Sequence, residues 1–395
     1  MYKKRQISII GGAGHVGFPL GLVLSSKGFN VKLVDINREN IKKINSGKIP
    51  FLEDGAQLLL RKMLKKKKIN ATKDFNQIRF SKYIIVCIGT PIDSNLNPDI
   101  KNFIKFFKTI KKFIHKDQII IIRSSVYPGI CEKVYNIIKT KNKNLSYCPE
   151  RIVQGQSIKE LPNISQLVSG KNEKSISESI SLFKTICKKI IKVEIIEAEL
   201  VKLFSNAYRY IHFSISNQLL MISEKQNLNF FKIRELMKDS YPRNAHIPMS
   251  GFTAGPCLLK DTMQLSSFFD KKFSLGHAAM EVNEGMPKYI IQNLERTYNL
   301  KKKTIGLLGL TFKADSDDIR DSLAIKLLNY LKRKKIKTLY SDEFFTLEGA
   351  VNKKDLINRS DIIIISSPHK AYKKIKFPKN KVLIDIWGHT NKTNF

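Results

Sequence analysis

The sequence predicts an α/β protein in which two doubly wound domains flank a helical region. Three observations favour this fold class. A short apolar strand, a glycine-rich loop and a helix pattern open the chain. Several aliphatic runs that end in polar loops follow, and the strand–loop–helix alternation returns at residue 304. Between these regions, residues 197–226 form a helix pattern without proline or glycine.

The first strand and loop predict a dinucleotide site. Residues 6–10 are apolar and run into Gly12, Gly14 and Gly17, which form a G-x-G-x-x-G pattern. A helix pattern and a second strand follow, and that strand ends at Asp35. Together these features indicate a Rossmann domain, in which the first glycine permits a tight turn and the second admits the pyrophosphate. Since an acid at position 35 repels a 2′-phosphate, NAD is expected rather than NADP.

Three later strands also end in polar loops. Residues 83–88 lead to Thr90 and Pro91, residues 118–122 lead to Ser125, and residues 145–147 lead to Glu150. Open α/β sheets bind ligands at the carboxyl ends of their strands, so these loops are candidate ligand contacts. Taken singly, each is also compatible with an ordinary connection.

The central helix carries Glu199, Lys202 and Asn206 at spacings that place them on one face. A lysine and an amide on one face could hold a developing oxyanion. An exposed Glu–Lys pair on a solvated helix is the alternative, although the neighbouring positions are largely apolar.

A single cysteine stands in a loop rich in small residues. Gly255 precedes Cys257, and Lys260 and Asp261 follow it. Cysteine becomes a nucleophile where a cation lowers the pKa of its thiol. A buried packing cysteine is the alternative, but the polar neighbours disfavour it.

The second alternating region contains expected strands near residues 304–310, 338–340, 361–365 and 382–386. Lys313 and Arg320 follow the first of these strands. By spacing alone, both side chains could be helix-capping charges.

The composition narrows the possible partners. A formal net charge of +36 could favour nucleic-acid binding, but lysines are spread along the whole chain and no arginine-rich stretch occurs. The five cysteines are odd in number and widely spaced, which favours a reducing cytoplasm over disulfides or a metal site. No apolar run approaches the roughly 20 residues of a membrane span. We therefore expect a cytoplasmic protein with no metal, no membrane partner and no nucleic-acid partner.

These motifs, in this order, resemble those of the UDP-glucose/GDP-mannose dehydrogenase family over nearly the whole chain. The cysteine loop resembles the family's Gly-Gly-x-Cys-x-x-Lys/Val-Asp pattern, with Ala254 in place of the first glycine. Ser125 replaces a threonine but keeps the hydroxyl. The segment 147–151 is most similar to the branch that acts on UDP-N-acetylhexosamines.

The resemblance implies three parts: an N-terminal Rossmann NAD-binding domain (1–195), a central helical dimerisation region with the cysteine loop (196–298), and a C-terminal Rossmann-like nucleotide-sugar-binding domain (299–395). It implies a homodimer or larger assembly. The implied reaction is the NAD-dependent four-electron oxidation of the C6 hydroxymethyl of a UDP-sugar, a UDP-N-acetylhexosamine or UDP-glucose, to the uronic acid. It passes through a thiohemiacetal and a thioester on Cys257.

The resemblance also implies a set of site residues. The catalytic residues are Cys257, Lys202, Asn206, Asp261, Glu150 and Ser125. The cofactor-binding residues are Gly12, Gly14, His15, Val16, Gly17, Asp35, Thr90, Pro91 and Arg320. The substrate-binding residues are Arg243, Lys260, Gly255 and Lys313.

Three other interpretations remain open. A two-electron hydroxyacid dehydrogenase on a Rossmann scaffold needs no thiol and would form one NADH per substrate instead of two. A non-enzymatic, basic nucleic-acid-binding protein would show a salt-dependent DNA shift. A catalytically inactive relative is the third, marked by the departures at Ala254 and Ser125.

Overall fold

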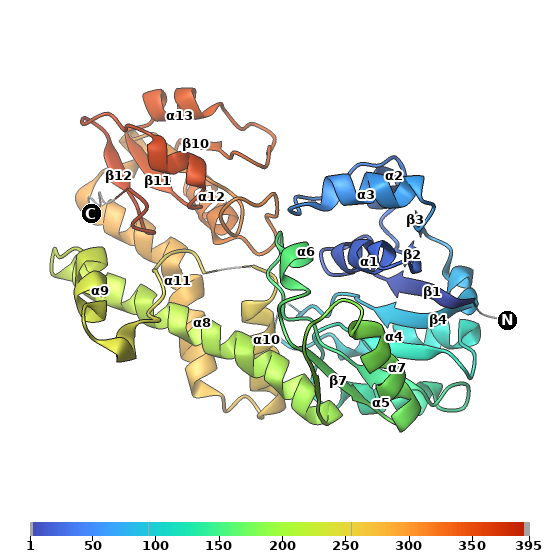
Figure 1. Cartoon of the computed structure of the whole chain (residues 1–395). Coiled ribbons are helices and arrows are strands. Elements are labelled where there is room, and N and C mark those ends of the chain that lie inside the picture. The colour runs from blue at the N-terminus through green and yellow to red at the C-terminus, as the bar shows by residue number, and fades with distance from the viewer. Residues whose placement is uncertain (1–2, 94, 254, 391–395) are drawn as a thin grey trace. The chain divides into compact units, whose positions relative to one another are not determined.

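A computed structural model describes residues 3–93, 95–253 and 255–390 of the chain (Figure 1). Ala254, which departs from the family pattern, lies outside the described residues. The chain divides into two compact units between Ser205 and Asn206. The division into compact units thus gives one boundary, and the three expected domain ranges stay a proposal.

The first unit holds an eight-stranded sheet with the order β3-β2-β1-β4-β5-β6-β7-β8. Neighbouring strands are parallel except for the antiparallel pair β6–β7. The strands are β1 Lys3–Ile10, β2 Asn30–Val34, β3 Ile69–Thr72, β4 Ser81–Val86, β5 Ile119–Ile122, β6 Leu145–Tyr147, β7 Gln166–Gly170 and β8 Ile190–Lys192. The order of the first six is that of a doubly wound dinucleotide fold, which confirms the predicted fold class.

Helices cover both faces of this sheet (Figure 1). They are α1 Gly17–Ser26, α2 Arg38–Asn45, α3 Ala56–Lys65, α4 Ile100–Ile110, α5 Ile130–Ile138, α6 Ser157–Glu160 and α7 Glu173–Phe183, with short 3-10 turns η1 Phe75–Phe80 and η2 Lys111–Phe113. Helices α1, α2, α3 and α7 share one apolar core with the sheet, and α4 and α5 share the other. The four isoleucines of β5 are all buried because the strand is covered on both faces.

The second unit is built around a parallel four-stranded sheet with the order β10-β9-β11-β12. Its strands are β9 Ile305–Leu308, β10 Thr338–Ser341, β11 Ile362–Ile365 and β12 Val382–Ile384. Its helices are α9 Phe230–Lys238, α10 Leu258–Phe268, α11 Ser274–Thr297, α12 Leu323–Arg333 and α13 Lys353–Arg359, with 3-10 turns η3 Pro242–Asn244, η4 Leu300–Lys302 and η5 Lys370–Lys374. One apolar core joins α9, α11, α12 and the end of α8 (Ile195–Lys225) to one face of this sheet.

The long helix α8, Ile195–Lys225, has 31 residues and contains the point at which the two units divide. It confirms the helix predicted for residues 197–226. Some apolar side chains of this helix are buried and others are exposed, as expected for the half-buried helix that the sequence predicts. Among the residues that the structure describes, neither this helix nor any other is long and apolar enough to traverse a bilayer.

Glu224, near the end of α8, makes the free energy of unfolding depend on pH. Its carboxylate accepts a hydrogen bond from the hydroxyl of Tyr289 on α11 at 2.7 Å. Burial raises the pKa of Glu224 from the ordinary value of 4.5 to about 7, although the Tyr289 bond opposes this. Between these pH values the unfolded chain releases the proton and the folded chain keeps it, so folding loses stability as pH rises.

We expect Glu224→Gln to remove this loss. The gain in the free energy of unfolding of the variant over the wild type should be small at pH 4.5. The gain should grow to roughly 3 kcal/mol at pH 7, because each unit by which the pKa of the folded state exceeds that of the unfolded state is worth about 1.4 kcal/mol. Urea unfolding at both pH values measures it. The control is Glu281→Gln, at an exposed position on α11, and a gain independent of pH would contradict the prediction.

Candidate active site

The fold requires two of the three glycines of the G-x-G-x-x-G pattern between β1 and α1, and it does not require the third. A Cβ on Gly12 would lie 2.6 Å from the carbonyl oxygen of Ile9, and one on Gly17 would lie 2.4 Å from that of Gly11. A Cβ on Gly14 would meet only the Gly11 oxygen, at 3.4 Å. Space beside Gly14 is therefore available to a ligand, as the backbone approach of a pyrophosphate requires.

Gly11 is a residue of this loop that the sequence analysis did not single out. Its φ is +73°, and a Cβ there would lie 2.6 Å from the carbonyl oxygen of Cys87. The backbone conformation and the close approach of the strand-β4 end both demand glycine. The consecutive pair Gly11-Gly12 was the available signal.

Asp35 follows β2 and faces the glycine loop. Its Oδ2 accepts the N–H of Ala13 at 2.9 Å, and its Oδ1 accepts the N–H of Asn37 at 2.9 Å. Each oxygen keeps a further lone pair, so the carboxylate can still accept from ribose hydroxyls. His15 packs on Phe51, with ring centroids 3.8 Å apart. Val16 is the N-cap of α1.

The loops after β4 and β5, which the sequence marked as candidate ligand contacts, are hydrogen-bonded to each other. The hydroxyl of Thr90 donates to the carbonyl oxygen of Ser125, and the hydroxyl of Ser124 donates to that of Ile88 at 2.6 Å. These bonds form because β4 and β5 are neighbours in the sheet. Pro91 directly follows Thr90 and is exposed. With the glycine loop, these loops lie at the carboxyl ends of β1, β4 and β5 and fit a dinucleotide.

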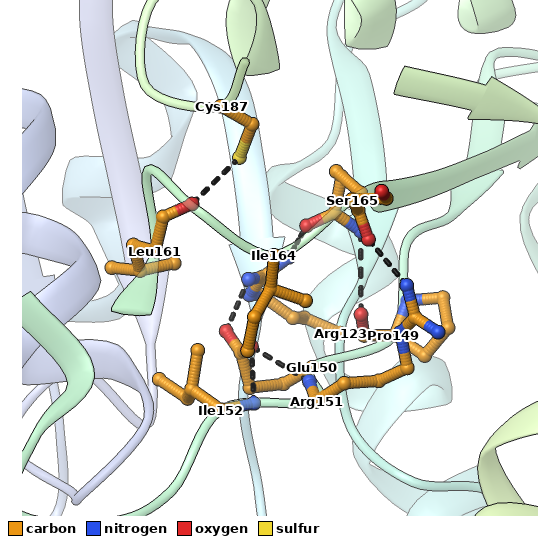
Figure 2. A pocket seen from close by; sticks show the side chains of 10 residues that line it. Arg123, Pro149, Glu150, Arg151, Ile152, Leu161, Ile164, Ser165 and Cys187 are labelled. Carbon is orange, nitrogen blue, oxygen red and sulfur yellow. Dashed lines mark hydrogen bonds and ion pairs between the residues drawn. The ribbon is translucent and has the colours of Figure 1, made fainter. Parts of the chain in front are cut away.

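Glu150, in the loop after β6, forms a buried ion pair that was not predicted (Figure 2). Its Oε2 accepts from Nη2 of Arg123, and its Oε1 accepts the N–H groups of Arg151 at 2.7 Å and Ile152 at 3.1 Å. The Arg123 side chain is fully buried. Burial opposes the guanidinium cation, but Glu150 outweighs it and the pKa of Arg123 is raised.

A small pocket lies beside this ion pair (Figure 2). Its volume of about 10 Å³ is near the space that one water molecule needs. Nη1 of Arg123 donates to the carbonyl oxygen of Cys148 at 3.1 Å and to Oε1 of Gln166 at 2.8 Å. The guanidinium therefore ties β5, β6 and β7 together beneath Glu150.

The first two members of the predicted triplet on α8 have different environments. The Glu199 carboxylate accepts the N–H groups of Gly129 at 2.6 Å and Cys131 at 3.0 Å, and so caps the first turn of α5. Burial raises the pKa of Glu199, which these bonds oppose. Lys202 is half-buried. Glu199 is therefore committed to the scaffold.

The cysteine loop brings four predicted residues together in the second unit. Cys257 is exposed and is the N-cap of α10. Asp261, one turn later, is fully buried. Its Oδ2 accepts from Nδ2 of Asn206 at 2.6 Å, and its Oδ1 lies 2.6 Å from Nζ of Lys260. Since the N-terminus of a helix favours negative charge, this position favours the thiolate of Cys257.

The C-terminal region contacts the cysteine loop through an aromatic ring. Gly255 has φ +104°, and a Cβ there would lie 2.5 Å from the ring of Phe312. The N–H of Phe312 donates to the carbonyl oxygen of Asp318 at 3.0 Å, and Asp318 pairs with Arg320 at 2.6 Å. Burial opposes the Arg320 cation, but Asp318, and to a lesser degree Cys257, raise its pKa. Arg320 and Cys257 therefore interact electrostatically.

A relay of amides anchors the start of the cysteine loop. The N–H of Gly251 donates to Oδ1 of Asn217 at 2.8 Å. Asn217 donates to Oδ1 of Asn283 at 2.8 Å, and Asn283 donates to the carbonyl oxygen of Tyr210 at 3.1 Å. Both asparagines are fully buried. They are positioning residues that sequence reasoning missed, because their partners are far away in the chain.

Two further predicted residues are less embedded. Arg243 is exposed on η3, and its guanidinium lies 5.4 Å from the Tyr241 ring centroid. Nζ of Lys313 lies 6.0 Å from the Phe312 ring centroid. Within residues 3–93, 95–253 and 255–390, no group of three or more histidine, cysteine or acidic side chains is arranged to hold a metal.

Three models of the UDP-glucose/GDP-mannose dehydrogenase family match the chain: the NAD binding domain over residues 5–190, the central domain over 196–285 and the UDP binding domain over 306–392. The first match makes NAD the cofactor of the glycine loop, which the open space at Gly14 and the carboxylate of Asp35 fit.

Individual relatives match over almost the full chain. The UDP-N-acetyl-D-mannosamine dehydrogenase of Pyrococcus horikoshii is 27% identical over 401 residues, which are 96% of this chain and 94% of that protein. A solved structure of the UDP-D-ManNAc dehydrogenase from the same organism has a TM-score of 0.87 at 26% identity, with the same coverage. The UDP-glucose dehydrogenase structure from Pyrobaculum islandicum has a TM-score of 0.89 and covers 99% of this chain and 96% of its own, but at 19% identity it supports the fold alone.

The contrast between Gly12 and Gly14 yields a prediction. Gly12→Ala should lower the free energy of unfolding by about 2 kcal/mol or more, because its Cβ meets backbone atoms at 2.6 Å and 2.7 Å. Gly14→Ala should change stability by less than about 0.5 kcal/mol. It should nevertheless weaken NAD binding at least about tenfold, since the methyl group occupies the approach of the pyrophosphate. Urea unfolding and calorimetric NAD titration measure both effects. Wild-type NAD affinity in Gly14→Ala would contradict the assignment.

Proposed function

Because the chain belongs to the UDP-glucose/GDP-mannose dehydrogenase family and is therefore an NAD-dependent nucleotide-sugar dehydrogenase, we propose that it oxidises the C6 hydroxymethyl of a UDP-N-acetylhexosamine to the uronic acid. The observation that carries the proposal is the exposed Cys257 at the N-terminus of α10. One helical turn later, Asp261 is held by Asn206 and Lys260. The relative named for UDP-N-acetyl-D-mannosamine supports the sugar class. UDP-glucose is the alternative substrate.

The proposed chemistry removes four electrons in two hydride transfers. NAD, when bound, supplies the hydride acceptor for each transfer. After the first, the Cys257 thiolate adds to the C6 aldehyde, and the resulting oxyanion takes up a proton to give a thiohemiacetal. Loss of a second hydride and the hydroxyl proton leaves a thioester. Water then adds to the thioester carbonyl, the carbon–sulfur bond breaks, and the carboxylate and free thiol are released.

The remaining catalytic residues have distinct proposed roles. Lys202 and Asn206 are four positions apart on α8, so one helix face can present both to a developing oxyanion. Asp261 orients water or accepts a proton and is itself oriented by Asn206. Glu150 assists thioester hydrolysis as a hydrogen-bond acceptor, since Arg123 and two backbone N–H groups hold its carboxylate in place. Ser125 supplies a hydroxyl to the same reaction.

The proposed binding residues divide into cofactor contacts and substrate contacts. The glycine loop, Asp35 and the Thr90-Pro91 loop would hold the cofactor, and Arg320 would contact it as well. The electrostatic interaction of Arg320 with Cys257 adds a second effect, because a nearby cation favours the thiolate. The proposed substrate contacts are Arg243, Lys260, Gly255 and Lys313. Since the five cysteines form no disulfide, we place the protein in a reducing cytoplasm.

We further propose a homodimer or larger assembly that forms through α8. Phe204, Tyr208, Ile215 and Ile222 are between 49% and 63% exposed. Their spacings of four, seven and seven residues place them along one face of the helix. An apolar stripe of this kind on a long helix is typical of a helix–helix contact between subunits.

The cysteine mechanism predicts the behaviour of Cys257→Ser. A serine hydroxyl is a poor nucleophile without a strong base, and an alkoxide leaves an ester slowly. With a UDP-N-acetylhexosamine, the wild type should form two NADH per sugar. The variant should stall after the first hydride transfer or as a trapped ester, with turnover reduced by about three orders of magnitude or more. Stopped-flow absorbance counts NADH, and mass spectrometry detects an adduct on residue 257.

The control for this experiment is NAD binding, which should be unchanged because sulfur to oxygen is a small change at an exposed position. Near wild-type formation of the uronic acid by Cys257→Ser would show that the thiol is not the nucleophile. One NADH per sugar in the wild type would favour the two-electron dehydrogenase.

The stripe predicts the oligomeric state. We expect a dimer or larger species by light scattering, and we expect Ile215→Glu to yield monomers because it places a charge in the apolar contact. Leu58→Glu is the matched control, since Leu58 is an exposed apolar residue on α3. A monomeric wild type at working concentration would refute the assembly.

A further inference from the structure

A buried histidine lies at the carboxyl ends of the second sheet, outside the residues assigned so far. His369 follows β11 and is fully buried. It stands next to the loop of residues 309–315, which leaves β9 and carries Lys313. The imidazole contacts this loop directly, and none of its contacts serves the chemistry at Cys257.

The hydrogen bonds of His369 define its tautomer. Its Nδ1 accepts the N–H of Asp315 at 2.9 Å, so Nδ1 carries a lone pair and no proton. The ring proton of the neutral imidazole is therefore on Nε2, which lies 3.1 Å from Oδ2 of Asp342 and 3.4 Å from the hydroxyl of Thr311. This assignment follows from the heavy-atom geometry. His369 thus connects the end of the loop to Asp342.

Asp342 holds the start of the same loop. It follows β10, and its side chain is fully buried. Its Oδ2 accepts the N–H groups of Leu310 at 2.5 Å and Thr311 at 3.2 Å. Burial alone would raise the pKa of Asp342, but His369 and the N–H groups of Leu310 and Phe344 outweigh burial and lower it. The pair His369–Asp342 therefore clamps the loop at both ends, with Lys313 between them.

Other bonds support the clamp without replacing it. The hydroxyl of Thr311 donates to the carbonyl oxygen of Lys313 at 3.0 Å, and Ser367 donates to that of Thr311. The Asp315 carboxylate is 3.2 Å from Nζ of Lys370. On the far side of His369, its carbonyl oxygen lies 2.8 Å from Nε2 of His389. The His369 imidazole joins the two ends of the loop, because it contacts the Asp315 N–H at one end and, through Asp342, the Leu310 N–H at the other.

We propose that His369 is a positioning residue that sets the place of Lys313 for the nucleotide part of the UDP-sugar. The inference rests on the proposed role of Lys313 as a substrate contact. A lysine on a long flexible stem binds phosphate best when its backbone is held in one place, because ordering it on binding costs affinity. His369 acts through Lys313 and touches no reacting atom.

A double-mutant cycle on the full chain tests this, with UDP as the probe in calorimetric titrations. His369→Leu should weaken UDP binding about tenfold, and Lys313→Ala should weaken it by as much or more. If His369 acts through Lys313, the double variant should bind UDP no more weakly than Lys313→Ala alone. His369→Asn, which keeps an acceptor in reach of the Asp315 N–H, should retain part of the affinity and guards against misfolding of the leucine variant.

NAD affinity, measured on the same samples, should stay at the wild-type value in every variant. With the sugar substrate, His369→Asn should raise the KM for UDP-sugar and leave kcat near the wild-type value. Fully additive losses in the cycle would overturn the inference while leaving the proposed function standing. An unchanged UDP affinity in Lys313→Ala would overturn both the substrate role of Lys313 and this inference.

Discussion

The buried carboxylate of Asp261 is the constraint on which the cysteine site depends. A charge with no exposure to water is costly unless it is paired and hydrogen-bonded. Lys260 and Asn206 meet that requirement, so the first turn of α10 has to lie against α8. The position of Cys257 follows, because it caps the same helix one turn earlier. The groups that pair with the buried carboxylate therefore also fix the helix turn that begins at Cys257.

Both sheets contain an aspartate that accepts backbone N–H groups at the end of a strand, but its surroundings differ between the two sheets. Asp35 after β2 and Asp342 after β10 both accept backbone N–H groups from the loop that leaves the neighbouring strand. In the first sheet, lone pairs of the carboxylate and the space at Gly14 remain open to a dinucleotide. In the second sheet, Nε2 of His369 lies 3.1 Å from Oδ2 of Asp342 and takes up a lone pair of that carboxylate. The same strand–loop–helix–strand arrangement thus leaves an acceptor open to a cofactor in one unit and pairs it with a histidine in the other.

The sequence predicted the elements whose structure is determined by local patterns. The glycine loop, the aliphatic strands and the central helix were predictable because their signals lie within a few residues of one another. The Glu150–Arg123 pair, the cap that Glu199 places on α5 and the His369–Asp342 clamp were not. Their partners are 27 to 70 positions apart. They come together because elements far apart in the chain pack side by side, which local patterns do not reveal.

The contact between Gly251 and Trp387 has an optical consequence. A Cβ on Gly251 would lie 2.4 Å from the indole ring, so ring and loop backbone are in direct contact. Trp387 is the single tryptophan of the chain. Its indole N–H donates to the carbonyl oxygen of Ser366, which holds the ring in place. The tryptophan emission of the protein therefore originates beside Gly251 at the start of the cysteine loop, and its wavelength and quenching report on that loop without any added label.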